Sequence, residues 1–309
     1  MKCRILFLFL LPLLLLSACS AETVNEPKGI SFTDALGRAV SLSTDDRIAA
    51  CHASFADCWL LAGGTLVGVT ADAVEDHGLA IGDASVIGTA KTVAIEALVA
   101  SGATVALLSA DLTAHLELES LLASLGIRCI YLRVDTFDDY AALMETFTDV
   151  TGRKDLYRHS VTDVGDRIAA IRMRLPEAES RSVLLMRAYS SGIKAKRDDN
   201  LAGQILKEFG LFNIADVSPS LMEDMGLEHI IAADPDCIFV LTMGDENAAR
   251  TYLRENIESN PAFAALTAVQ NGNYHILPKE LFHYKPNESW DQSYAYLAEI
   301  LYPKTFPQP

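Results

Sequence analysis

The sequence predicts an α/β protein built from two Rossmann-like lobes, which a long connector helix joins and between which a ligand cleft lies. Three observations support this fold class: both halves alternate strand and helix patterns, one long amphipathic stretch separates them, and a glutamate-centred segment occurs twice. Such alternation is typical of parallel sheets with right-handed crossovers. A chain of 309 residues is long enough for two such lobes.

Residues 1–18 have the pattern of a signal peptide. Two basic residues, Lys2 and Arg4, precede an apolar run that ends in small residues before Cys19. A positive start, an apolar core of about a dozen residues and a small-residue cut site are the marks of a secretory signal. Because the run is shorter than the roughly 20 residues of a membrane-spanning helix, we expect it to be removed.

Cys19 is the predicted lipidation site. The segment Leu16-Ser-Ala-Cys resembles a bacterial lipobox, in which the thiol receives a diacylglycerol. Polar residues 19–29 would then form a flexible tether. We therefore expect a lipid-anchored protein on the extracytoplasmic face of the bacterial cell membrane, with ordinary secretion and an incidental cysteine as the alternative.

The charge balance excludes several classes of partner. The whole chain carries a net charge of −16, and loss of Lys2 and Arg4 with the signal peptide makes the mature protein more acidic still. Such acidity argues against nucleic-acid binding and against a body lying flat on anionic lipid. We expect a monomer.

The cysteines do not form a metal-binding pattern. After the signal peptide and the lipidation site, Cys51, Cys58, Cys129 and Cys237 remain, and their spacing matches no zinc or CxxC motif. We expect buried free thiols, and we leave open a bridge between the first two. No histidine and carboxylate set converges in the sequence, so we predict no metal site and no resident cofactor.

We assign residues 30–150 to an N-terminal lobe. Its predicted strands lie at 30–34, 37–42, 47–50, 66–70, 105–109 and 127–134. Its predicted helices lie at 56–62, before Gly63-Gly64, and at 113–125, before Gly126.

Residues 151–176 are the predicted connector helix. An apolar stripe recurs there at steps of three and four residues, at Val161, Val164, Ile168, Ile171 and Leu175. Because a helix resists bending more than a pair of loops does, we expect only a small lobe closure on ligand binding.

Residues 177–309 form the predicted C-terminal lobe. Its strands are expected at 182–186, 237–241 and 274–277, and a helix at 201–209. The two lobes also repeat a segment, since 94–100 (AIEALVA) matches 226–232 (GLEHIIA) and each is followed by a loop and an apolar strand. Two facing lobes create one cleft, which is where small ligands usually bind.

The order of these segments resembles a known family. Residues 32–40 (FTDALGRAV) come first, followed by 59–64 (WLLAGG), the two glutamate-centred segments and the long helix between them. This arrangement is similar to the substrate-binding proteins of bacterial ABC importers for iron–siderophore, haem and cobalamin, over about residues 30 to 303. One departure is 101–104 (SGAT), where the family usually has Lys/Arg-Pro-Asp.

The resemblance implies that Glu96 and Glu228 contact the importer permease, one from each lobe. In the family, the glutamate at each of these positions docks into an arginine pocket. An exposed carboxylate near a helix N-terminus can meet an arginine in bidentate geometry. The alternative is a solvated helix face.

Candidate ligand-binding residues follow the predicted strands, because ligands of open α/β sheets bind beyond the carboxyl ends of the strands. These candidates are His52, Phe55, Arg187, Tyr189, Lys196, His283 and Tyr284, with Cys51, Lys194, Arg197, Lys279 and Phe282 in the same segments. The basic group after residue 186 stands out in an acidic chain and would attract an anionic ligand. Arg187 is the preferred contact because a guanidinium pairs bidentately with a carboxylate.

His52 and His283 are expected in opposite lobes. Either one could ligate haem iron or the metal of a corrinoid, with Tyr284 or Tyr189 as the phenolate option. The alternative is that each histidine only forms hydrogen bonds.

The preferred function is capture of a ferric siderophore outside the membrane and its delivery to an ABC importer. A haem- or cobalamin-binding protein on the same scaffold is the nearest alternative, and the sequence does not choose between these chelates. A surface-anchored enzyme is disfavoured because the chain lacks Gly-x-Ser-x-Gly, a phosphate loop and HExxH. We therefore predict a binding protein that is not an enzyme.

Overall fold

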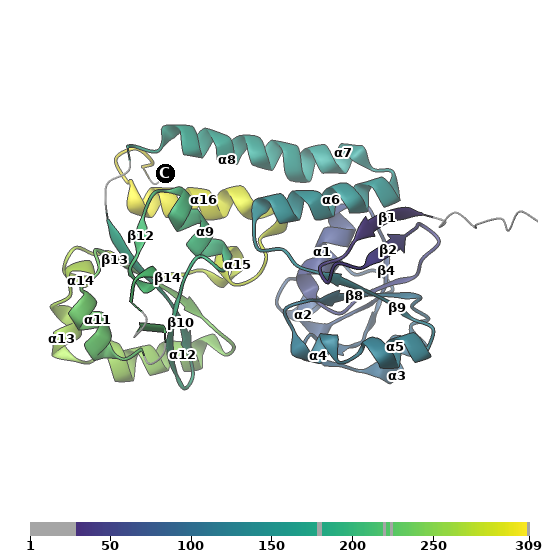
Figure 1. The fold of residues 1–309 in the computed structure, drawn as a ribbon, viewed down its shortest axis with the longest axis horizontal. Coiled ribbons are helices and arrows are strands. Elements are labelled where there is room, and N and C mark those ends of the chain that lie inside the picture. Colours follow the sequence, from purple (N-terminus) through teal and green to yellow (C-terminus); the bar gives the residue numbers. More distant parts are fainter. Residues whose placement is uncertain (1–28, 178–180, 219–220, 223–224, 308–309) are drawn as a thin grey trace, which may run out of the picture.

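The computed structural model describes residues 29–177, 181–218, 221–222 and 225–307. The predicted signal peptide, Cys19 and nearly all of the tether lie outside the described residues. Two α/β lobes lie side by side under a pair of long helices (Figure 1). The two-lobe fold predicted from the sequence is confirmed.

The N-terminal lobe contains a five-stranded parallel sheet in the order β5-β4-β3-β8-β9. Its strands are β3 (Ile48–Ala50), β4 (Leu66–Val69), β5 (Ser85–Val86), β8 (Val105–Ser109) and β9 (Arg128–Leu132), with small hairpins β1 (Ile30–Thr33)–β2 (Ala39–Leu42) and β6 (Gly88–Thr89)–β7 (Thr92–Val93). Its helices are α1 (Ala53–Leu61), α2 (Ala71–Glu75), α3 (Ile95–Ala100), α4 (Thr113–Leu116), α5 (Glu119–Ser124) and α6 (Phe137–Thr151). The single helix predicted at 113–125 is therefore wrong, because the chain breaks it into α4 and α5.

The connector comprises α7 (Lys154–Tyr157), a π-helical turn η1 (Arg158–Thr162) and α8 (Asp163–Arg174). It begins later than predicted because Gly152, at φ 72°, adopts the left-handed conformation that ends α6. It ends at Arg174 because the next residue is extended before a proline. The predicted apolar stripe faces inward, and helix α8 packs against α16 (Trp290–Leu301).

The C-terminal lobe has its own sheet, in the order β11-β10-β13-β14, with β12 also beside β10. Its strands are β10 (Ser182–Tyr189), β11 (Gly192–Lys196), β12 (Phe212–Asn213), β13 (Cys237–Thr242) and β14 (Tyr274–Leu277). The helical elements before α16 are α9 (Leu201–Glu208), η2 (Ile214–Asp216), α11 (Leu227–Ala233), α12 (Glu246–Leu253), η3 (Arg254–Glu258), α13 (Pro261–Ala264), α14 (Thr267–Gln270), α15 (Lys279–Phe282) and η4 (Asn287–Ser289).

The first strand of this lobe is longer than predicted. Strand β10 continues past Met186 to Tyr189 and returns as the antiparallel strand β11. The basic segment that we expected as a loop is therefore a β-hairpin, and its side chains alternate between two faces.

Four parallel strands of each sheet follow the same order. Strands β4-β3-β8-β9 of the first lobe correspond to β12-β10-β13-β14 of the second. Helix α3 leads into β8 and helix α11 leads into β13, so the repeated glutamate segments occupy the same place in both lobes.

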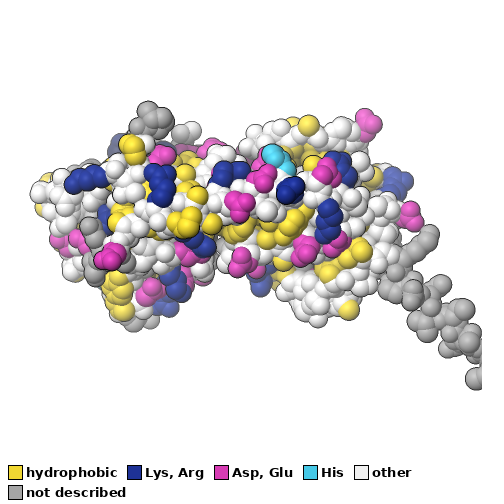
Figure 2. All heavy atoms as spheres, turned by 90° about the horizontal axis from the view of Figure 1, so that it is seen from above, with side chains coloured by type: hydrophobic (Ala, Val, Ile, Leu, Met, Phe, Trp, Pro, Cys, Tyr) yellow, Lys and Arg dark blue, Asp and Glu magenta, His cyan; other side chains and the backbone are white. Residues whose placement is uncertain are grey.

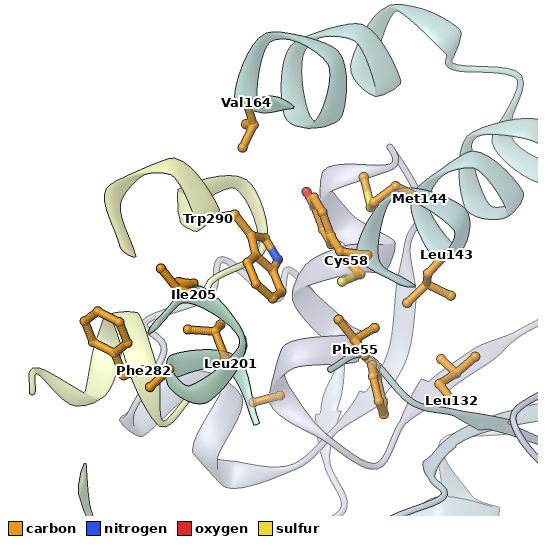
Figure 3. Packing of buried hydrophobic residues seen from close by; sticks show 14 of the residues in the cluster. Phe55, Cys58, Leu132, Leu143, Met144, Val164, Leu201, Ile205, Phe282 and Trp290 are labelled. Carbon is orange, nitrogen blue, oxygen red and sulfur yellow. The ribbon is translucent and has the colours of Figure 1, made fainter. Parts of the chain in front are cut away.

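The largest hydrophobic cluster includes residues of both lobes. Trp290, at 1% exposure, belongs to this cluster. Figure 3 shows its indole between Leu201 and Ile205 on one side and Cys58 on the other. The ring of Phe137 from α6 meets it edge-on, with centroids 6.1 Å apart. The lobes are therefore joined by a shared core as well as by the connector.

The face above the connector carries Lys/Arg and Asp/Glu side chains interspersed along the molecule (Figure 2). Such mixing is typical of a solvated surface. None of the helices in the described part of the chain is both long and apolar enough to cross a membrane.

Candidate functional site

The carboxyl end of β3 leads directly into α1, and His52 is the N-cap of that helix. Its Nδ1 accepts a hydrogen bond from the amide of Ser54 at 3.3 Å. Burial lowers the pKa of His52 to about 4, and the nearby Asp72 carboxylate only partly opposes the shift. His52 is therefore neutral at neutral pH. Phe55, also predicted to bind ligand, is 2% exposed and packs in the shared core, so in this conformation it presents no ligand surface.

His283 and Tyr284 follow α15 in the C-terminal lobe. Burial lowers the pKa of His283 to about 4, and the positive charges of Lys279 and Arg187 lower it further. The ring of Tyr284 lies 4.7 Å from that of His77 and 5.2 Å from that of His283. Because His77 follows α2, this contact brings the two lobes together at the candidate ligand site.

Arg187 points from the same face of β10 as Leu185, directly opposite Lys194 on β11. Its Nε is buried and has no hydrogen-bond partner within the described residues. No carboxylate in the described part of the chain forms an ion pair with Arg187. A guanidinium beside a neutral histidine, without an acidic partner, is suited to bind an anion.

Two other basic residues of the predicted ligand-binding segments have partners within the protein. The Nζ of Lys196 lies 2.5 Å from the Asp199 carboxylate. The Nε of Arg197 donates to the carbonyl oxygen of Ala215 at 3.1 Å. Both therefore stabilise the turn after β11, and ligand binding by Lys196 stays a prediction, in which the ligand would compete with Asp199.

Tyr189 lies at the end of β10, beside a cavity of about 560 Å³. The lining of this cavity comes from the hairpin, from the segment before α11 and from α12; it comprises Tyr189, Ser191, Gly192, Ile193, Lys194, Leu221, Met222, Met225 and Tyr252. Lys194, which is paired with Arg187 across the hairpin, thus adds a second positive charge, and Tyr189 adds a phenol hydroxyl.

Sequence reasoning missed three side chains of the N-terminal lobe. Asp72 and His77 follow β4, and the buried His115 follows β8, where its Nδ1 accepts from the amide of Ser109 at 2.8 Å. The Asp72 carboxylate raises the pKa of His52, His77 and His115, although burial lowers each pKa more. The three histidines therefore lie near the same carboxylate. Applying the strand-end rule to β4 and β8, as well as to β3, would have found them.

The two repeated glutamates occupy equivalent positions. Glu96 is the second residue of α3, and Glu228 is the second residue of α11. Both side chains are exposed, and neither forms an ion pair with another described residue.

The four remaining cysteines are free thiols, so the bridge left open between Cys51 and Cys58 is not formed. Cys129 is half-buried and the other three are buried. Within the described ranges, no group of three or more His, Cys, Asp or Glu side chains is arranged to hold a metal ion.

The fold has two α/β lobes, which a long helix joins and which meet at a basic, histidine-containing site. This arrangement defines a solute-binding protein. The chain belongs to the periplasmic binding protein family, which matches residues 48–281. This assignment confirms the predicted resemblance and indicates an extracytoplasmic location.

Known proteins are similar to this chain in sequence and in fold. The chain is 25% identical over 281 residues to the Fe(3+)-citrate-binding protein YfmC of Bacillus subtilis, covering 87% of this chain and 86% of that protein. Among solved structures, it is similar to the triscatecholate siderophore-binding protein FeuA of Bacillus subtilis complexed with ferri-bacillibactin, at a TM-score of 0.70, 18% identity and 88% and 98% coverage of the two chains. It is also similar to Staphylococcus aureus IsdE complexed with heme, at a TM-score of 0.68 and 16% identity, covering 83% of this chain and 99% of that chain.

Proposed function

We propose that this protein captures an anionic ferric chelate outside the cell membrane and delivers it to an ABC importer. The observation that carries this function is Arg187, whose buried Nε has no partner in the described residues and whose charge acts on the neutral His283. In a chain of net charge −16, a cation without an acidic partner supplies a local attraction for a carboxylate. The Fe(3+)-citrate-binding relative supports this ligand class.

Binding measurements test this function directly. Purified protein would be titrated with ferric citrate, hemin and cobalamin by calorimetry and by quenching of tryptophan fluorescence. We expect ferric citrate to bind, and Arg187→Gln to weaken that binding by roughly 10- to 100-fold, since hydrogen bonds to charged groups contribute about 1.5–3 kcal/mol. Failure of all three ligands to bind would overturn the proposed function.

A matched control separates the site from general charge effects. Arg250 is also an arginine of the C-terminal lobe, but it lies on the exposed helix α12 and pairs with Glu246 at 2.7 Å. Arg250→Gln changes the net charge as Arg187→Gln does. It should leave the chelate affinity unchanged.

Haem is the second candidate ligand. Iron ligation requires a neutral imidazole, and the pKa values of about 4 keep both His52 and His283 in that form. Mixing the protein with hemin should then shift the Soret band, and His283→Ala should abolish the shift. An unshifted band would remove this alternative.

The proposed importer contact uses Glu96 and Glu228. Both are exposed in the first turn of equivalent helices, where no described cation neutralises them. Exchanging both for alanine should abolish chelate uptake by cells while leaving the affinity for the chelate intact. A loss of affinity would contradict this role.

The proposed anchor is a lipid on Cys19. A short tether would raise the effective concentration of the protein near its membrane partner. Cys19→Ser should release the protein from membranes and prevent incorporation of labelled palmitate. Retention of the variant in the membrane fraction would contradict lipidation.

A further inference from the structure

The repeated helices α3 and α11 share more than their glutamates. Leu98 and Ile230, two residues after the glutamates, are both 0% exposed and hold each helix on its lobe. One residue later, Val99 is 45% exposed and Ile231 is 37% exposed. The exposed aliphatic residue therefore repeats together with the buried one.

Core packing does not account for these two aliphatic side chains. Leu98 and Ile230 belong to hydrophobic clusters of their lobes, and Ile95 and Leu227 pack against the same clusters. Neither Val99 nor Ile231 is among the residues of those clusters. Each leaves a large share of its apolar surface in water.

A single exposed aliphatic residue is ordinary on a protein surface. Its repetition is not expected from packing alone, because an exposed side chain adds little to the core and the two helices differ at the preceding surface position, where Ala97 of α3 corresponds to His229 of α11. What both helices retain is an exposed glutamate and an exposed branched aliphatic residue three positions later. Residues three apart lie on one face of a helix, so the two side chains of each pair are neighbours.

We propose that Val99 and Ile231 are apolar anchors of the importer contact, each meeting the permease beside the glutamate of its own helix. This inference rests on the proposed docking function of Glu96 and Glu228. Helices α3 and α11 both lie away from the connector, α3 at the lower edge of one lobe and α11 on the outer side of the other (Figure 1). The side chains of both pairs are exposed.

The chemistry of the pair indicates the partner surface. An arginine offers a charged guanidinium for the carboxylate and an apolar stem for the aliphatic side chain. Burying the aliphatic group next to the ion pair excludes water from it and strengthens the attraction. The permease should therefore present, at both contacts, an arginine bordered by an apolar recess.

The test compares three double variants for uptake of radioactive ferric citrate by cells that lack the wild-type protein. They are Val99→Ser with Ile231→Ser, Glu96→Ala with Glu228→Ala, and the control Val86→Ser with Val217→Ser. The control residues are also exposed aliphatic residues, one in each half of the chain, at 51% and 64% exposure. Calorimetry with ferric citrate and thermal unfolding would accompany each variant.

We expect the Val99/Ile231 variant to reduce uptake on the order of tenfold, since two apolar side chains leave the contact. Its ferric citrate affinity and unfolding temperature should match the wild type, and the Val86/Val217 control should transport normally. Loss of uptake in the glutamate variant alone would overturn this inference and leave the docking proposal standing. Normal uptake in both the glutamate and the Val99/Ile231 variants would overturn both. An equal loss in the control would also overturn the inference.

Discussion

The side-chain amide of Asn287 donates a 2.6 Å hydrogen bond from Nδ2 to Oδ2 of Asp57 and so links the segment before α16 to helix α1. The same nitrogen donates to the carbonyl oxygen of Ser54 at 3.1 Å, and Oδ1 accepts from the thiol of Cys58 at 3.3 Å. Asn287 is 1% exposed and has a φ of 48°. A single buried side chain thus joins two parts of the chain that are 230 positions apart.

Asn287→Ala should destabilise the protein by about 2–4 kcal/mol. The substitution removes three hydrogen bonds, leaves the half-buried Asp57 carboxylate without its donor, and places alanine at a positive φ. Urea unfolding would measure this loss. Asn287→Gly relieves the backbone strain only, so it should recover part of the stability. A loss below about 0.5 kcal/mol for alanine would show that the link is unimportant.

Trp290→Leu should cost about 3 kcal/mol, because a large side chain at 1% exposure would leave a cavity between the lobes. Since the cavity lies in the shared core, the distance between the lobes should fluctuate more in the variant than in the wild type. Small-angle scattering would measure this difference. A matched change is Tyr302→Leu, which removes a buried aromatic at the end of α16. It should lower stability without changing the scattering curve.

The Asp34 carboxylate holds together segment 32–40, one of the segments on which the family resemblance rests. It accepts hydrogen bonds from the amides of Leu36 and Arg38, both at 3.0 Å, and from Arg38 Nη2 at 2.6 Å. Arg38 in turn lies 4.8 Å above the ring of Tyr131. This network fastens the β1–β2 hairpin to the edge strand β9.

Asp34→Ala should therefore cost about 1–3 kcal/mol, because it removes the buried acceptor of several hydrogen bonds and leaves the partly exposed Arg38 without its carboxylate. Burial raises the pKa of Asp34, but hydrogen bonds from Arg38, Tyr131 and Leu36 outweigh it and bring the pKa below 3.8. The contribution of Asp34 is thus fully present above pH 3.8 and is lost as the pH falls through the lower, folded-state value. Acid unfolding of the wild type and the variant should converge only below that pH.

The regular elements of this fold were predictable because each follows from a local pattern. The stripe from Val161 to Ile168 identified the connector, since it repeats at the helical period. The end of β10 was missed because Arg187 and Tyr189 alternate with the buried Ala188, and a polar residue in a strand of mixed exposure looks like the start of a loop.

The candidate site was less predictable because its contacts join distant segments. His77 and Tyr284 are 207 positions apart, and no local pattern indicates that their rings meet. Whether a basic residue is free also depends on tertiary structure: Lys196 and Arg187 belong to one hairpin, but only Lys196 finds a carboxylate.

Reducing agents should leave the thermal stability unchanged, because the four cysteines after Cys19 are free. Burial raises the pKa of the Cys51 thiol to about 12 and that of Cys129 to about 11, so few thiolates exist at neutral pH. Of the four, the half-buried Cys129 should react first with an alkylating reagent, as peptide mass spectrometry would show. Rapid modification of Cys51 in the folded protein would contradict this arrangement.

The half-buried His52 should make the stability depend on pH in a defined window. His52 has an ordinary pKa of 6.5 in the unfolded chain and about 4 in the folded protein. Between these values the unfolded chain binds more protons, so stability should fall as the pH is lowered from about 6.5 to 4 and change little above that window. The shift corresponds to about 3 kcal/mol.

His52→Asn isolates this contribution, because asparagine retains a good N-cap for α1 but does not titrate. The difference in unfolding free energy between wild type and variant would be measured at pH 7 and at pH 4. Relative to the variant, the wild type should lose about 3 kcal/mol over this interval, while other titrating groups cancel in the comparison. A difference that stays constant with pH would mean that the pKa of His52 is the same in the folded and the unfolded chain, which would contradict the lowered pKa of the folded protein.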